Sequence, residues 1–139
     1  MKTRIVIDTQ IVLSAFFFGG DAQRIIETVV RGKLKAYATR EIVEEYNAAF
    51  KRMKSRKKGN IPRELLLPFT SRLQIIEPKT EETVCSDPDN DKFVSCAIDA
   101  KAFCLIANDA RAYLSKGPSK AILIVTPDYF CQVLSLLVI

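Results

Sequence analysis

The chain has no histidine among its 139 residues, and this absence excludes more than any other feature of its composition. Without an imidazole, neither a Ser-His-Asp nor a Cys-His nucleophile system can be built, and a zinc site with histidine ligands is excluded as well. Catalysis would have to depend on carboxylates, lysine, tyrosine, serine, threonine or cysteine. Any metal site should bind its ion through oxygen atoms.

Cysteine pairs with C-x-x-C spacing are also absent. Three of the four cysteines lie in apolar stretches, and the full set is Cys85, Cys96, Cys104 and Cys131. This pattern is typical of buried free thiols in a reducing compartment. We therefore expect a cytoplasmic protein.

Long hydrophobic runs are missing as well. The longest uncharged stretch, residues 9–20, is too short to span a bilayer. Near the N-terminus, Asp8 and Gln10 interrupt the apolar residues, which argues against a signal peptide. We expect no membrane association.

The remaining composition is that of an ordinary globular chain. Hydrophobic residues make up 48% and charged residues 27%, which argues against disorder. The length suits one domain with a substantial core, and no repeat or long linker divides it, so we expect a single domain over residues 1–139. Lysine and arginine number 21 against 16 acids, and the resulting charge of +5 permits a polyanionic partner.

Short apolar runs alternate with helical patterns along the chain. Strands are expected at residues 4–7, 34–38, 73–76, 103–107 and 122–125. Helices are expected at residues 11–18, 22–31, 39–54, 62–73, 91–101, 111–115 and from 126 onward, with Asp21 and Thr39 among the capping residues. This alternation predicts an α/β fold with a mainly parallel sheet that helices cover on both faces.

Two predicted strands end at an acid. Asp8 follows residues 4–7, and Asp109 lies just past residues 103–107. Binding sites of open α/β sheets lie outside the carboxyl ends of the strands, so both acids are site candidates. Each could instead cap the helix that follows it.

Helical phase selects further acids. In the helix predicted over residues 39–54, Glu45 lies about 80° from the centre of the apolar stripe, whereas Glu44 lies nearly opposite. In the helix over residues 91–101, Asp91 shares its azimuth with Ile98. Asp87 and Asp89 precede that helix, where capping or turn formation is the ordinary role of an acid.

Four converging carboxylates would repel one another unless a cation lay between them. Sites made only of carboxylate oxygens favour Mg²⁺ or Mn²⁺ over zinc, and such ions can activate water against a phosphodiester. A basic segment close to the Glu45 helix suits the same substrate, as an RNA-binding surface that consists of Lys51, Arg52, Lys54, Arg56, Lys57 and Lys58. The same charges could also be a solvated helix end.

Taken in order, these segments resemble the motifs of PIN-domain nucleases. Residues 5–10 (IVIDTQ) are similar to the opening strand of that family, and residues 41–46 (EIVEEY) to its acid-bearing second motif. Residues 87–93 (DPDNDKF) resemble the third motif and residues 107–109 (AND) the fourth. The end of the chain, from residue 124 to residue 130, resembles that of a subgroup described as toxin components of toxin–antitoxin systems, related to VapC-like toxins.

The resemblance implies a three-layer α/β/α sandwich and an Mg²⁺- or Mn²⁺-dependent endoribonuclease. It also implies a cognate antitoxin that holds the enzyme inactive and, often, a homodimer. Carried over residue by residue, the catalytic and metal-binding acids would be Asp8, Glu45, Asp91 and Asp109, with Asp89 as the alternative to Asp91.

Two positions depart from the family pattern. Gln10 stands where the family commonly has Asn, and Ala107 replaces a Ser or Thr two residues before the fourth acid. The chain could therefore be a catalytically weakened scaffold that binds RNA or an antitoxin. The apolar C-terminal residues 133–139 (VLSLLVI) should be buried, either in the core or in a dimer interface.

Overall fold

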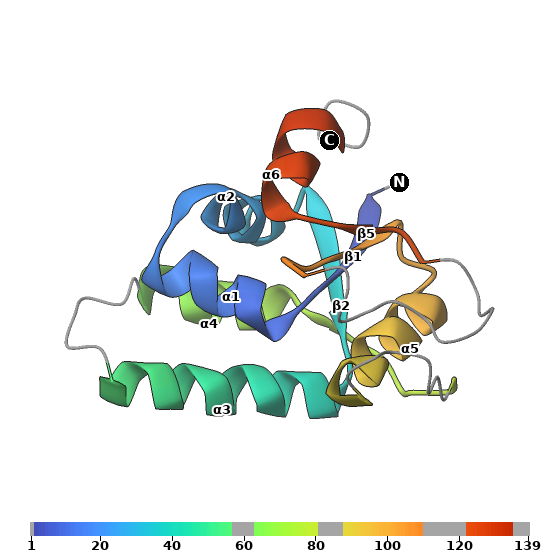
Figure 1. Cartoon of the computed structure of the whole chain (residues 1–139), viewed down its shortest axis with the longest axis horizontal. Coiled ribbons are helices and arrows are strands. Elements are labelled where there is room, and N and C mark those ends of the chain that lie inside the picture. The colour runs from blue at the N-terminus through green and yellow to red at the C-terminus, as the bar shows by residue number, and fades with distance from the viewer. Residues whose placement is uncertain (1, 57–62, 81–87, 110–121, 135–139) are drawn as a thin grey trace.

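A sheet of five parallel strands forms the centre of the fold. The computed structural model describes residues 2–56, 63–80, 88–109 and 122–134 (Figure 1). The strands lie side by side in the order β3-β2-β1-β4-β5, and every neighbouring pair is parallel. Their bounds are β1 (Thr3–Ile7), β2 (Leu34–Ala38), β3 (Gln74–Ile75), β4 (Cys104–Ile106) and β5 (Ile124–Val125).

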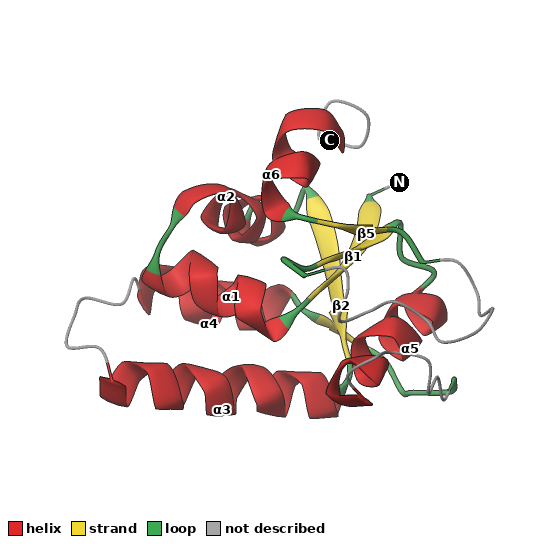
Figure 2. Ribbon diagram, viewed as in Figure 1, coloured by secondary structure: helices red, strands yellow, loops and turns green. Residues whose placement is uncertain are grey.

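Helices cover both faces of this sheet (Figure 2). On one side lie α1 (Thr9–Phe17), α2 (Gly20–Val30), α3 (Arg40–Arg56) and α4 (Arg63–Arg72). On the other side, α5 (Asp91–Ala100) packs against β1, β2 and β4, after the short turn η1 (Pro88–Asn90). The predicted three-layer α/β/α fold is confirmed, with a sheet that is parallel throughout its described strands.

The core explains why β4 and the last three residues of β1 lack alternating polarity, whereas β2 alternates buried and half-buried residues. Ile5, Val6 and Ile7 of β1 are completely buried, and so are all three residues of β4. Strands that helices cover on both faces need apolar side chains in both directions, which produces continuous apolar runs. Between α1, α3 and α4, aromatic rings pack against one another, namely those of Phe16, Phe17, Tyr46, Phe50 and Phe69.

Element ends differ from the prediction by a few residues. The strands β3, β4 and β5 are each shorter than the apolar runs that contain them, although the amides of Ile76, Phe103 and Ala107 beside them still donate hydrogen bonds to neighbouring strands. Gly32 follows α2 with a positive φ of 78°, a conformation in which glycine commonly ends a helix, and this agrees with the predicted end of the helix at residue 31. The helix predicted over residues 111–115 lies outside the described residues.

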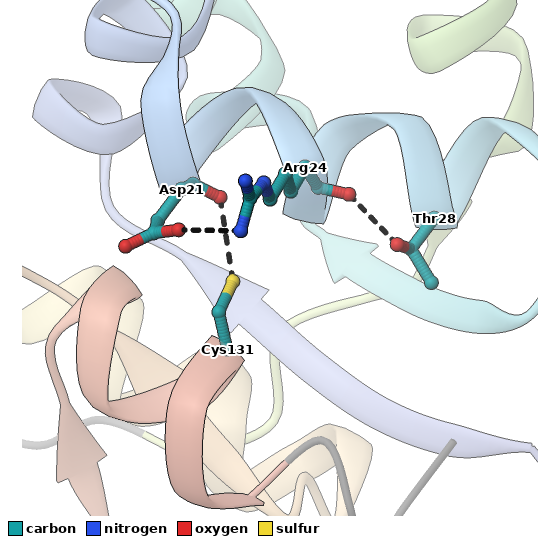
Figure 3. A network of polar contacts seen from close by, with 4 residues as sticks. All are labelled: Asp21, Arg24, Thr28 and Cys131. Carbon is teal, nitrogen blue, oxygen red and sulfur yellow. Dashed lines mark hydrogen bonds and ion pairs between the residues drawn. The ribbon is translucent and has the colours of Figure 1, made fainter.

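The predicted cap of α2 is wrong. Gly19, with φ of 77°, precedes the helix and provides no side-chain cap, so Asp21 lies inside the first turn. There its carboxylate pairs with Arg24 at 3.5 Å, and its backbone carbonyl accepts a hydrogen bond from the thiol of Cys131 at 3.6 Å (Figure 3). Cys131 belongs to the π-helical turn η3 (Phe130–Leu134), which follows α6 (Pro127–Tyr129). This contact ties the end of the described chain to α2.

Two thiols are deeply buried in the core. Burial raises the pKa of Cys104 to about 12, and burial together with the nearby Asp99 carboxylate raises the pKa of Cys96 to about 12. Both thiols therefore stay protonated near neutral pH and are free cysteines. Among the described residues, none of the helices is both long enough and apolar enough to cross a membrane.

Candidate functional site

The strand order defines where a site is expected. From β1 the chain moves outward to β2 and β3, and then returns to β4 on the other side of β1. This change of direction leaves a crevice at the carboxyl ends of β1 and β4, where open α/β sheets bind their ligands. The two ends are in contact, since the amide of Asp8 donates to the carbonyl of Ile106 at 2.9 Å.

Asp8 is the first candidate acid at this edge. The residue is only 9% exposed, and its carboxylate accepts a hydrogen bond from the amide of Gln10 at 2.6 Å. Asp8 thus caps α1 from the end of β1, so the capping role that the sequence left open is real. Capping also fixes the carboxylate at the crevice, so Asp8 can both cap α1 and belong to the candidate site. The Gln10 side chain, a supporting candidate, is exposed.

Glu45 lies where helical phase places it. It is half-buried, whereas Glu41 and Glu44 on the same helix are exposed. Thr9 donates a hydrogen bond from its hydroxyl to Oε2 of Glu45, and Lys92 Nζ lies 2.6 Å from Oε1. These two contacts join the starts of α1 and α5 to α3. The first, second and third motifs of the sequence therefore meet at one place.

Tyr46 holds the Glu45 helix against the sheet. Its hydroxyl donates to the carbonyl of Ile7, the last residue of β1. Burial, with further contributions from Cys96, Asp8 and Glu45, raises the pKa of Tyr46 well above its usual value. The phenol therefore remains a hydrogen-bond donor, and it positions α3 at the carboxyl end of β1.

The other predicted acids occupy the same region of the fold. Asp91 is half-buried in the first turn of α5, directly before Lys92, and Asp89 is exposed in η1. Asp109 is exposed three residues after the end of β4. Ala107, between β4 and that acid, is buried and has no hydroxyl to donate or accept a hydrogen bond.

Oxygen ligands for a divalent cation are thus carried by neighbouring elements. Carboxylates are the donors that Mg²⁺ and Mn²⁺ favour, so the residue types fit such an ion. In the present side-chain positions, however, no three acidic or cysteine side chains within the described parts of the chain are grouped closely enough to hold a metal ion. The convergence of all four acids therefore stays a prediction.

A cavity of about 670 Å³ opens beside this edge. It lies between the start of α3, the segment after β3, and the start of α5. Its lining is Thr39, Arg40, Glu41, Ile76, Glu77, Pro78, Thr80, Pro88, Asp89, Asp91, Lys92, Ser95 and Cys96. Asp91 and Lys92 line the cavity and also lie at the carboxyl edge of the sheet with the other candidate acids, which we call the acid-bearing edge. The cavity is therefore continuous with the candidate site.

Asp99 anchors one wall of this cavity. Its carboxylate accepts hydrogen bonds from the amides of Lys79 and Thr80 at 2.8 and 3.1 Å, and from the Thr80 hydroxyl at 2.7 Å. Burial by itself would raise the pKa of Asp99, but these hydrogen bonds outweigh it and hold the pKa below its usual value. The charged form of Asp99 therefore stabilises the segment that follows β3.

We expect Asp99→Asn to lower the free energy of unfolding by about 1 kcal/mol at pH 7, since hydrogen bonds to a partly exposed carboxylate weaken when its charge is removed. A lowered pKa means that this stabilisation is present above the unfolded-state pKa and is lost as the pH falls through the folded-state pKa. The difference from wild type should therefore begin to shrink below about pH 4, near the unfolded-state pKa of an aspartate, and should vanish only once the pH is below the folded-state pKa. Urea unfolding at several pH values measures it, with Glu77→Gln, an exposed acid of the same segment, as the control. A difference that persists undiminished in acid would contradict the assignment.

The predicted RNA-binding segment is only partly described. Helix α3 extends to Arg56, and both Lys51 and Arg52 have exposed side chains. Lys54 and Arg56 belong to the helix, while Lys57 and Lys58 lie outside the described residues. Lys51 follows Glu45 by six residues, which places it ~9 Å farther along the helix axis. The basic segment therefore begins less than two helical turns after Glu45.

The fold is an open, parallel α/β sheet with acids near its switch point, the place where such sheets bind their ligands. Residues 4–111 match the family described as PIN domain, so the chain belongs to the PIN domain family. It is also 33% identical over 106 residues to the uncharacterized protein MJ1680 of Methanocaldococcus jannaschii, a match that covers 73% of this chain and 68% of that protein. PIN domains are generally nucleases that act on nucleic acid and use divalent metal ions.

Three residues of the site were not singled out from the sequence. Thr9 and Lys92 contact Glu45, and Tyr46 holds its helix in place. Each of them directly follows a predicted acid in the chain. Their positions next to candidate acids could have drawn attention to them. Adjacency in the sequence does not, however, indicate which group each side chain contacts.

Proposed function

We propose that this chain is an Mg²⁺- or Mn²⁺-dependent endoribonuclease whose metal-binding acids are Asp8, Glu45, Asp91 and Asp109. Asp89 is the alternative to Asp91, and Gln10 is a supporting residue. The observation that carries the proposal is the pair of contacts from Thr9 and Lys92 to Glu45. Thr9 directly follows Asp8, and Lys92 directly follows Asp91. Their contacts with Glu45 therefore bring three of the four proposed acids into the same region, at the switch point of a PIN domain.

The chain's own residues would prepare the site. Capping of α1 fixes the Asp8 carboxylate, and the Tyr46 hydroxyl fixes the helix that carries Glu45. Asp8, Glu45, Asp91 and Asp109 would hold a divalent cation, and such an ion would supply an activated water and stabilise the leaving oxygen of a phosphodiester. The neighbouring cavity is within the size range of small-ligand sites, ~300–1,000 Å³, which suits a nucleotide beside the cleaved bond.

Basic residues support RNA as the substrate. Lys51 and Arg52 are exposed on α3, and the sequence continues with Lys54, Arg56, Lys57 and Lys58. Arg52 follows Glu45 by seven residues, so both lie on nearly the same side of the helix. A strand of RNA whose phosphates contact this segment could extend directly to the acids, and counterion release would favour its binding.

Cleavage of a structured RNA in the presence of Mn²⁺ tests the proposal. Wild type should cleave, and Asp8→Asn should cleave at least ~100-fold more slowly, because even the outer partners of metal ligands are worth 10–100-fold. Asparagine caps helices as well as aspartate does, so the variant should remain folded. Equal cleavage by both proteins, or cleavage by neither across several RNAs, would contradict the proposal.

A catalytically weakened binding module is the second candidate. The observations that favour it are the amide of Gln10, longer than the family's usual Asn, and the missing hydroxyl at the buried Ala107. Salt-sensitive RNA binding that survives Asp109→Asn, without cleavage by wild type, would support this function instead.

The biological role that we propose is that of the toxin in a toxin–antitoxin pair, acting in the cytoplasm as a single domain over residues 1–139. The resemblance of the four acid-bearing motifs and of the C-terminal residues to VapC-like toxins supports it, and the buried free thiols agree with a reducing compartment. A small open reading frame directly upstream of the gene, encoding a protein that co-purifies with this chain and blocks cleavage, is the expected observation.

We also propose a homodimer. Val133 is 44% exposed in the C-terminal apolar segment, whose residues 135–139 lie outside the described parts of the chain. Sedimentation equilibrium should then show a mass that rises from monomer to dimer with concentration. A monomer mass independent of concentration would exclude a stable dimer.

A further inference from the structure

The Glu45 carboxylate already has a cationic partner within the chain. Lys92 Nζ lies 2.6 Å from Oε1, while the hydroxyl of Thr9 donates to Oε2. Both oxygens of this candidate metal ligand are therefore engaged by other side chains. A divalent cation that used either oxygen would have to share it or replace a donor.

The ion pair is more than a surface contact. The Lys92 side chain is 17% exposed and that of Glu45 is 31% exposed. The ammonium also lies 5.6 Å from the centre of the Phe93 ring, an attractive position for a cation. Because both charges are partly removed from water, their attraction is screened less than that of an exposed pair.

Lys92 lies at the edge of the sheet where the candidate acids gather. It follows Asp91 at the start of α5, and its ammonium crosses to α3 at the carboxyl edge of the sheet. Carboxylates gathered at one edge repel one another, and a nearby positive charge relieves that repulsion. The ammonium of Lys92 thus does, at Glu45, what a bound cation would do.

We propose that Lys92 is an internal counter-ion which a divalent cation must displace from Glu45 when the site binds metal. This inference rests on the proposed metal centre, and it adds that the Lys92 ammonium competes with the metal ion for the Glu45 carboxylate. In the absence of metal, Lys92 keeps the acid-bearing edge folded and Glu45 neutralised. When metal binds, the energy of the ion pair is subtracted from the binding energy, so Lys92 lowers the affinity of the site for its cation.

Calorimetric titration of Mn²⁺ into the intact chain, without RNA, tests the inference. We expect Lys92→Met to bind Mn²⁺ about tenfold more tightly than wild type, within the usual range of coupling between two competing ligands. Lys92→Arg, which keeps the charge, should bind within about twofold of wild type. The control Lys33→Met removes an exposed lysine between α2 and β2 and should leave the affinity unchanged.

Thermal unfolding supplies a second measurement. Lys92→Met should unfold at a lower temperature than wild type without metal, and saturating Mn²⁺ should raise its unfolding temperature by more than it raises that of wild type. A purely structural role for Lys92 would lower the unfolding temperature without tightening Mn²⁺ binding.

The outcomes separate this inference from the proposed function. If wild type binds Mn²⁺ and Lys92→Met binds no more tightly, the counter-ion role is wrong while the metal centre stands. If neither wild type nor any variant binds Mn²⁺, the metal centre itself is wrong, and the counter-ion role is overturned with it.

Discussion

Phe69→Ala should lower the free energy of unfolding by about 3–5 kcal/mol, the usual cost of removing a buried phenylalanine ring. Phe69 is completely buried in α4, and its ring centre lies 6.2 Å from that of Phe16 and 6.3 Å from that of Tyr46. Its removal would leave a cavity between α1 and α3, the helix that carries Glu45. Urea denaturation measures the change, with the midpoint and slope fitted together.

Leu67 provides a matched control on the same helix. It is 72% exposed, so Leu67→Ala should change the free energy of unfolding by no more than about 0.5 kcal/mol. Equal destabilisation by both substitutions would mean that α4 does not support the core as described.

Glu45→Gln should reduce Mn²⁺-dependent RNA cleavage by at least ~100-fold, if Glu45 is a metal ligand as proposed. Glutamine is nearly the same size and can still accept a hydrogen bond from Thr9, but it carries no charge for a metal ion or for Lys92. The ammonium of Lys92, whose side chain is only 17% exposed, would then lose its charged partner, so the free energy of unfolding should also fall by about 1–2 kcal/mol.

Glu44→Gln is the control for this substitution. Glu44 is the preceding residue of the same helix and is exposed, so its neutralisation removes the same charge from a different face. Cleavage and stability should remain close to wild type. If Glu44→Gln were as damaging as Glu45→Gln, overall charge rather than a specific site would account for the loss.

Local patterns in the sequence predicted much of the fold. The apolar runs at β1 and β2 and the capped start of α3 lie where expected, because each depends on neighbouring residues: β-branched side chains, a stop at Gly32, and the Thr39 hydroxyl, which accepts from the amide of Ile42 at 3.3 Å. Helical phase also placed Glu45 at the border of the packed face and Glu44 in solvent. The assignment of an α/β/α fold follows from the same local signals.

The predicted element ends were wrong where the local sequence was compatible with more than one start or end of a helix or strand. Asp21 can cap a helix, but the positive φ of Gly19 started α2 earlier and left Asp21 in the first turn. The edge strands β3 and β5 have only two paired residues each, because pairing requires a partner strand in register, which the apolar run by itself does not reveal.

By itself the sequence determined which chemistry is open to this protein and which acids can take part. A chain without histidine is restricted to oxygen and sulfur ligands, and spacing along each element selects the acids that border the core. Only the tertiary structure decided which side chains meet. The contacts of Thr9 and Lys92 with Glu45 join residues 36 and 47 positions apart, and no periodicity reaches that far. Strand order brings them together, because parallel strands deliver the starts of their helices to the same edge of the sheet.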